Sequence, residues 1–308
     1  MNPAWSVICF TTLAGAAQGL VVMLALATLG GLAPRHSFAA GALGIALVML
    51  VVSLGSSFLH LGRPMRAWRA ATMWRTSWLS REVIVLPLFI AAVGLWWLWL
   101  YTGRGNPRSL LVAVVVLAFA LWWCTGMIYA AIRFIAEWAH RLTLLNYTLI
   151  GLASGCTLLV ALAVWRGESS LAQVLAPVAL GLTLLAWGGR TLALRRNAGL
   201  KPKSTLQSAT GIRSTSIRQH SMGMSAGAFN TREFFHGVGL AALQRVRWAL
   251  HGLCFALPAA LLAVGVATGT LEHVVLASLV QVPGLLAERW FFFAQARHPQ
   301  NVYYQVVS

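Results

Sequence analysis

Eight apolar runs, each about 20 residues long, constrain this chain more than any other feature. A helix of about 20 residues spans a hydrocarbon core about 30 Å thick, where every backbone polar group must be paired within the protein. Only 9% of the residues are charged and 59% are hydrophobic, whereas about a quarter are charged in soluble domains. The sequence therefore predicts an all-α integral membrane protein with eight transmembrane helices, built as a single membrane domain over residues 1–308.

The expected spans are joined mostly by short polar turns. They cover residues 5–32, 37–61, 82–101, 110–134, 144–165, 171–192, 248–266 and 274–293. The first run has no basic stretch before it and no small-residue cleavage site after it, so we expect a retained span rather than a signal peptide.

One connection is long, at residues 190–247, and it is basic and rich in Ser, Thr and Gly. Connections of this length are usually functional or disordered. A flexible tether is one interpretation, but Phe234 and its aromatic neighbours are costly to leave in a free loop. We expect an ordered platform with a helix that starts at Asn230 or Thr231 as N-cap.

The positive charge is distributed unequally between the two faces that these spans define. The formal net charge is +17, with 23 Lys and Arg residues. Only Arg35, Arg104, Arg108 and Arg166 fall on one face, and the other 19 fall on the face with both termini. Membrane proteins concentrate Lys and Arg on the cytoplasmic side, so this bias predicts cytoplasmic termini and a cytoplasmic 190–247 loop, rather than nucleic-acid binding.

Neither the cysteines nor the histidines indicate a bound metal centre in this chain. The four cysteines are isolated within apolar runs, without a C-x-x-C pair, so no zinc or iron–sulfur site is predicted. No histidine lies near the middle of a predicted span. A haem between His60 and His251, at the span ends, is conceivable, but haem is not favoured.

A dense polar stretch, residues 60–82, lies between the second and third runs, and a quinone fits its chemistry. A quinone needs hydrogen-bond donors at its carbonyls, groups that exchange protons, and apolar helix faces for its tail. His60 can donate to a carbonyl and titrates near neutral pH, while Glu82 can exchange protons with water. The predicted quinone site comprises His60, Gly62, Arg63, Arg66, Ser80 and Glu82.

Structural roles compete with these assignments. Ser80 also has the position of an N-cap for the third span, with Glu82 in its first turn. Arg69 and Arg75 are best explained by the cytoplasmic excess of basic residues.

Glu137 is a second candidate for proton transfer, beside Glu82. It belongs to a stripe of residues at spacing four that is predicted to continue the fourth helix: Tyr129, Arg133, Glu137 and Arg141. An ordinary interfacial ion pair between Arg133 and Glu137 is the alternative interpretation.

Two blocks of this stretch resemble the signature of the dimethyl sulfoxide reductase membrane-anchor family: residues 60–67, HLGRPMRA, and residues 77–83, SWLSREV. The tail from Phe292 to Tyr304 also resembles the end of the family, although Gln295 stands where the family usually has an acidic residue. The resemblance implies an eight-helix bacterial inner-membrane subunit without haem that exchanges electrons between ubiquinone or menaquinone and an iron–sulfur subunit. That subunit is attached to a molybdopterin catalytic subunit, and His60 matches a residue associated with quinol binding.

The loop blocks 200–207 (LKPKSTLQ) and 229–236 (FNTREFFH), with the cytoplasmic orientation, resemble the branch found in quinone-linked sulfite dehydrogenases. This implies a non-molybdenum subunit of an oxidoreductase that carries electrons from cytoplasmic sulfite oxidation to quinone. Besides membrane lipid, the expected partners are the iron–sulfur and molybdopterin subunits. The candidate docking residues on this chain are Arg213, Arg218, Arg232 and Phe234.

Two alternatives stay open. One is a quinol-oxidising anchor of an S-oxide or N-oxide reductase. The other is a secondary transporter, which would have inverted repeats and spans broken near the midplane. Pro258, Pro283 and Gly284 interrupt the last two runs, and Pro87 is the one proline inside a run of the first half.

Overall fold

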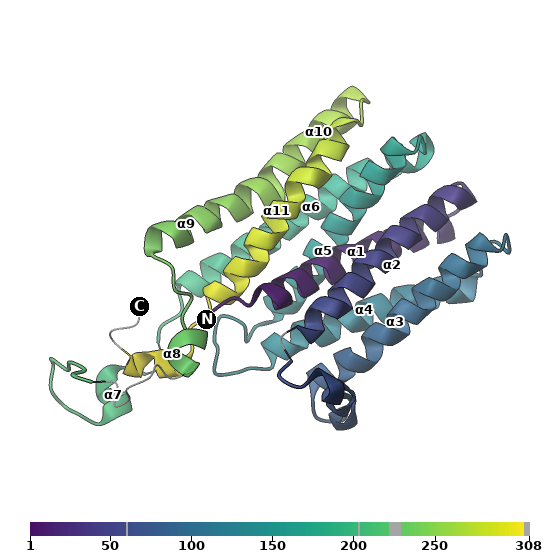
Figure 1. Cartoon of the computed structure of the whole chain (residues 1–308). Helices are drawn as coiled ribbons and strands as arrows, with labels where there is room; N and C mark the ends of the chain where they lie inside the picture. Colours follow the sequence, from purple (N-terminus) through teal and green to yellow (C-terminus); the bar gives the residue numbers. More distant parts are fainter. Residues whose placement is uncertain (60, 203, 222–228, 305–308) are drawn as a thin grey trace.

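The computed structural model describes residues 1–59, 61–202, 204–221 and 229–304. All regular structure in these ranges is helical, and eight helical segments in them are long and apolar enough to cross a membrane (Figure 1). They are α1 (Trp5–Leu29), α2 (His36–Phe58), α3 (Trp78–Tyr101), α4 (Arg108–Ala130), α5 (Arg141–Trp165), α6 (Ser169–Ala198), the continuous segment α9 (Leu240–Ala249), η2 (Leu250–Ala256) and α10 (Leu257–Thr268), and α11 (His273–Ala294). The predicted helical class and the eight spans are confirmed.

Both ends of the described chain lie at one end of the bundle, which we call the terminal end (Figure 1). The N-terminal amino group donates a hydrogen bond to the Ala296 carbonyl at 2.8 Å. The opposite end, the turn end, carries the short turns, where Arg35 pairs with Glu168 at 2.5 Å. An even number of spans brings both termini to the same face. The terminal end is therefore the face that the sequence predicts to be richer in Lys and Arg.

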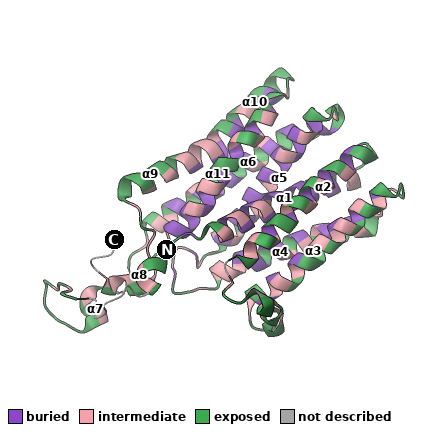
Figure 2. Ribbon diagram, viewed as in Figure 1, coloured by how far each residue is buried: buried purple, intermediate pink, exposed green. Residues whose placement is uncertain are grey.

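Helix α1 is the central element. In its most apolar window 78% of the residues are buried within the protein, against 28% for α3, and Figure 2 shows the same contrast between α1 and the outer helices. Helices in a membrane gain little from the hydrophobic effect and associate through close packing, often at small residues. A Cβ added to Gly155 of α5 would overlap the backbone of Gly19 of α1, so these two helices cross at backbone contact. Gly284 of α11 lies equally close to the backbone of η2 at Cys254.

Several boundaries differ from the sequence expectation. Helix α6 continues to Ala198 and α9 begins at Leu240, so the long connection covers 199–239 and Arg190 lies inside a helix. Helix α4 ends at Ala130, and residues 131–140 form turns, so the predicted helical continuation of the stripe to Glu137 is wrong. These turns bury Ile135 and Trp138, whose indole donates to the Phe292 carbonyl at 3.0 Å. Tertiary burial therefore outweighs the local tendency to continue the helix.

The described parts of the long connection pack against the C-terminal tail. The helices α7 (Leu206–Thr210) and α8 (Phe229–Glu233) lie near η3 (Pro299–Tyr303) at the terminal end (Figure 1). The Tyr303 hydroxyl donates to the Ala209 carbonyl at 3.0 Å, and the Asn301 amide donates to the Phe234 carbonyl at 3.0 Å.

The start of α8 corrects one detail of the prediction. Since α8 begins at Phe229, Asn230 and Thr231 lie within its first turn rather than at its N-cap. The Asn230 amide instead donates to the Tyr304 hydroxyl, which ties α8 to the C-terminal tail.

Candidate functional site

Helix α3 begins four residues earlier than expected, and this places its polar residues differently. Ser77 is the N-cap, and its hydroxyl accepts a hydrogen bond from the Ser80 amide at 3.3 Å. The prediction that Ser80 caps the helix with Glu82 in the first turn is therefore wrong. Ser80 lies in the first turn and Glu82 in the second, and their exposed fractions are only 3% and 5%.

Glu82 is held in the interior by the neighbouring helix. Antiparallel packing sets the start of α3 beside the end of α4, and the Thr125 hydroxyl donates a hydrogen bond to Glu82 Oε1. A carboxyl group in an apolar interior is costly unless it is paired, and such residues within membrane spans are usually functional. Glu82 is thus a buried carboxyl group near the terminal end of the bundle.

The stretch that precedes α3 lies outside the bundle. Gly62 and Arg63 are exposed, and the 3₁₀ helix η1 (Pro64–Met73) exposes Arg66 and Trp68. Tryptophans together with basic residues are typical of a segment at the membrane surface. The guanidinium of Arg81 holds this stretch against α3 through the carbonyls of residues 74 and 75, both at 2.9 Å.

The structure therefore divides the predicted quinone site into two parts. Ser80 and Glu82 belong to α3 and are buried inside the bundle, whereas Gly62, Arg63 and Arg66 are exposed on the surface. In the described parts of the chain, no hydrogen bond or ion pair joins the two groups. His60 lies outside the described residues.

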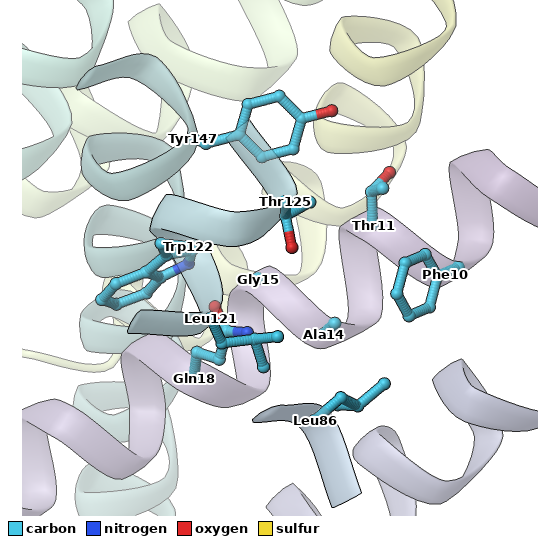
Figure 3. A pocket seen from close by; sticks show the side chains of 10 residues that line it. All are labelled: Phe10, Thr11, Ala14, Gly15, Gln18, Leu86, Leu121, Trp122, Thr125 and Tyr147. Atoms are coloured by element: carbon cyan, nitrogen blue, oxygen red, sulfur yellow. The ribbon is translucent and has the colours of Figure 1, made fainter. Parts of the chain in front are cut away.

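Thr125 also lines a small cavity between α1, α3, α4 and α5 (Figure 3). Its volume is about 10 Å³, close to the minimum for one water molecule. In Figure 3 the Thr125 hydroxyl points into the space above Gln18, and the ring of Tyr147 lies on the other side of Thr125. Gln18 Oε1 and Trp122 Nε1, both buried, have no hydrogen-bond partner among the described residues.

A buried charge cluster lies beyond Tyr147. Arg190 Nε is 2.9 Å from Glu288 Oε1, and Arg289 Nε is 3.5 Å from Glu288 Oε2. All three side chains are nearly inaccessible, at 1% to 4% exposure. The Arg289 guanidinium also lies 3.9 Å from the ring centroid of Tyr147, a cation–π contact that strengthens where water is excluded.

The sequence alone does not assign this cluster to the site. In the sequence prediction, Glu288 and Arg289 are used only as charges of the basic face. Arg190 falls at the start of the expected long loop. A signal is nevertheless present, because all three interrupt apolar stretches of helices, and ionisable residues at membrane depth are functional candidates.

Glu137 lies in a different place from Glu82. It lines a cavity of about 600 Å³ at the terminal end, which we call the vestibule. Other residues of its lining are Asn197, His236, Arg247, Gln295 and Arg297.

Two histidines near the vestibule favour the uncharged form. Burial lowers the pKa of His236 and of His298, and the charge of the N-terminal amino group lowers both pKa values further. The His298 ring stacks on Phe234 with 3.8 Å between centroids. His251, the other possible haem ligand, accepts a hydrogen bond at Nδ1 from Trp187 at 3.0 Å.

The four predicted docking residues all belong to the terminal end. Arg213, Arg218 and Arg232 are exposed, and Phe234 is half-buried against His298. Exposed arginines around a packed aromatic residue are a suitable surface for another protein subunit.

Comparison with known proteins decides the family. The sequence matches the family described as DMSO reductase anchor subunit (DmsC) over residues 1–293. The chain belongs to this family. The anchor subunit is 45% identical to the C subunit of sulfite dehydrogenase from Allochromatium vinosum, with both sequences covered completely. It is 28% identical to the C polypeptide of anaerobic dimethyl sulfoxide reductase from Escherichia coli, over 60% of the anchor subunit and 66% of its relative.

The membership confirms the resemblance that residues 60–67 and 77–83 carry. The protein is a multi-pass membrane anchor subunit of a DMSO reductase-type oxidoreductase complex. Complexes of this family contain molybdopterin and iron–sulfur partners, and the anchor subunit accounts for the membrane part.

Proposed function

We propose that the anchor subunit passes electrons from cytoplasmic sulfite oxidation to the membrane quinone pool. The molybdopterin subunit would oxidise sulfite with water to sulfate, two protons and two electrons. The iron–sulfur subunit would carry the two electrons to the anchor, where quinone takes them with two protons and becomes quinol. The net reaction is sulfite plus water plus quinone giving sulfate plus quinol, which balances.

The observation that carries this proposal at the site is the buried Glu82. Reduction of a quinone requires a proton at each of its two oxygens, and a carboxyl group held near the membrane surface can supply one. Thr125 fixes one oxygen of Glu82, and the other oxygen has no hydrogen-bond partner among the described residues. The quinone head would lie between Glu82 and the 60–66 segment, with carbonyl contacts from His60, Arg63 or Arg66.

The sulfite substrate and the orientation rest on two further observations. The full-length relative at 45% identity is named a sulfite dehydrogenase subunit. Counted from the sequence, the face that holds both termini has 19 of the 23 Lys and Arg residues, which favours the cytoplasmic side. The exposed Arg213, Arg218 and Arg232, together with Phe234, would then dock the iron–sulfur subunit from the cytoplasm.

A second function is the reverse flow, from quinol to an S-oxide reductase. The 28% match to a dimethyl sulfoxide reductase polypeptide supports it, but over a smaller share of both sequences. A transporter has less support, because the family match, which covers residues 1–293, is to an anchor subunit.

The Glu82→Gln variant tests the site in the purified complex of anchor, iron–sulfur and molybdopterin subunits. We expect sulfite-dependent reduction of a soluble quinone analogue to fall about 100-fold, because general acid catalysis contributes about 10² to 10⁴. Sulfite oxidation with a dye that accepts electrons from the iron–sulfur subunit should not change. His60→Ala should behave in the same way.

The matched control is Glu272→Gln, at an exposed position of the turn end. It should retain both activities. Full quinone reduction in Glu82→Gln would refute the site, and loss of dye-linked activity in the same variant would show a defect of assembly instead.

A further inference from the structure

The vestibule lies where three of the long helices reach the terminal end. Its lining combines residues of the 234–239 segment with Leu194 of α6, Leu243 and Arg247 of α9, and Phe291 of α11. Figure 1 shows the terminal ends of α9 and α11 apart from each other. The volume of about 600 Å³ falls within the range of ligand pockets, about 300 to 1,000 Å³. The vestibule is therefore large enough for an organic ligand.

The lengths of the helices place the vestibule at the membrane surface. Helix α6 has 30 residues, and the continuous segment of α9, η2 and α10 has 29. At about 1.5 Å per residue each is about 40 to 45 Å long, which matches the hydrocarbon core together with both headgroup layers. The terminal ends of both segments therefore lie among the lipid headgroups. Trp248 is 76% exposed beside Arg247, as expected of a tryptophan at this interface.

The floor of the vestibule is apolar. Leu194 and Phe291 are buried, and Leu243 and Phe235 are half-buried. An apolar surface is covered at lower cost by hydrocarbon than by water. The acyl chains of a lipid, which begin directly below the headgroups, suit this floor.

The rim of the vestibule is basic. Arg247 and Arg297 are exposed, and neither belongs to an ion pair within the described parts of the chain. Glu137 is the acidic side chain of the described lining, which thus holds two positive charges and one negative charge. Guanidinium groups bind phosphate oxygens through two parallel hydrogen bonds. The rim therefore favours a ligand that carries a phosphate.

Buried polar atoms in the lining also lack partners. Gln295 Nε2 and Asn301 Oδ1 make no hydrogen bond to any described residue. The Gln295 amide can donate to a phosphate or ester oxygen, and the Asn301 oxygen and the Glu137 carboxylate can accept from a hydroxyl. A glycerol phosphate headgroup offers both kinds of partner, because it has phosphate oxygens and free hydroxyls.

We propose that the vestibule is a binding site for an acidic phospholipid. Arg247 and Arg297 hold the phosphate, and the acyl chains lie along Leu243 and Phe291. Basic pockets between transmembrane helices bind acidic lipid headgroups in this way. The bound lipid joins α9 to α6 and α11 beside the platform of α7, α8 and η3. This inference does not depend on the proposed electron transfer.

Binding of phosphatidylglycerol to the purified three-subunit complex in detergent tests the site, with native mass spectrometry to detect the bound lipid. We expect the affinity to fall about fivefold in Arg247→Gln and about fivefold in Arg297→Gln, since each arginine near a lipid phosphate contributes about this factor. Both variants should assemble with native yield, because both side chains are exposed.

Arg245→Gln is the matched control. Leu240, Leu243 and Arg247 share one face of α9 by their spacing, and all three line the vestibule. Arg245 is exposed on the opposite face, outside the described lining, so its substitution should leave the affinity unchanged.

Two further probes separate the lipid from other ligands. Phosphatidylcholine, which has no net charge, should bind the native complex at least about fivefold more weakly than phosphatidylglycerol. Inorganic phosphate, which has no acyl chains, should not displace phosphatidylglycerol at equal concentration.

Equal affinities for phosphatidylglycerol in Arg247→Gln and Arg245→Gln would overturn the lipid site. Equally tight binding of phosphatidylcholine would overturn it too, as would displacement by inorganic phosphate, which would show a site for a free anion. Displacement by the quinone analogue would assign the vestibule to quinone instead. The Glu82→Gln test is a separate measurement, so the lipid site and the proposed quinone site can fail independently.

Discussion

At the scale of single residues, Glu82 and Thr125 are the pair that most clearly ties local structure to function. Thr125 donates to a carboxylate oxygen that is almost inaccessible to solvent. The sequence motif predicts the importance of Glu82, but nothing in it indicates Thr125, which is 43 residues away. Such a partner follows only from the register of α3 against α4.

Replacing Thr125 with Val tests this contact, because Val has nearly the same shape but no hydroxyl. We expect the complex to lose about 1 to 3 kcal/mol of stability, the usual cost of leaving a buried polar group without its partner. Thermal unfolding in detergent measures the loss.

Thr183→Val is the matched control. Thr183 is also buried, but its hydroxyl bonds only the Ala179 carbonyl of its own helix at 2.7 Å. The Thr183→Val substitution should lower the midpoint temperature of thermal unfolding much less than Thr125→Val does. Equal shifts for the two variants would show that the Glu82 contact adds no stability.

The buried charge cluster escapes prediction from the sequence for one physical reason. Arg190 falls in the expected loop because the predicted sixth span ends too early, and Glu288 with Arg289 reads only as surface charge. Their pairing requires Arg190 of α6 to reach Glu288 of α11, and a single sequence does not define how the helices are placed in the bundle.

At the scale of elements, the number and order of the helices are predictable, because the length of an apolar run and the thickness of a membrane fix them. The ends are less predictable. Continuous apolar and charged periodicity suggests that α4 extends to Glu137, but the burial of Ile135 and Trp138 folds this segment back. The segment 61–77 is a connection, as expected, although nothing in its pattern indicates the 3₁₀ helix that it forms.

The crossing of α1 and α5 at Gly19 and Gly155 gives a prediction about packing. Gly155→Ala places a methyl group on the backbone of α1, so the helices must separate. We expect a loss of about 1 to 3 kcal/mol or more, as for overpacked cores, seen as a lower unfolding temperature and a lower yield of complex.

Gly181→Ala serves as the control, since a Cβ at Gly181 of α6 meets no other atom within 4 Å. Helix propensity alone would make this change neutral or stabilising by about 1 kcal/mol. If Gly155→Ala were as stable as Gly181→Ala, the close crossing would be wrong.

At the scale of the whole molecule, one end of the bundle concentrates everything that the proposed function needs. The platform of α7, α8 and η3 lies at the terminal end (Figure 1). Glu82 near the start of α3, the charge cluster and the vestibule belong to the same end. The turn end holds short connections and four basic residues. This polarity is what an anchor with partners on one side requires, and the count of Lys and Arg predicts it from the sequence.

The central claim is that the subunit links sulfite oxidation on the cytoplasmic side to membrane quinone. Sealed membrane vesicles of known orientation test it directly, because sulfite is an anion that reaches only the outward-facing surface unless it is transported. Inverted vesicles, which expose the cytoplasmic face, should reduce their quinone when sulfite is added, and right-side-out vesicles should not. Quinone reduction by sulfite in right-side-out vesicles alone, or none in either while dye-linked sulfite oxidation continues, would contradict the account.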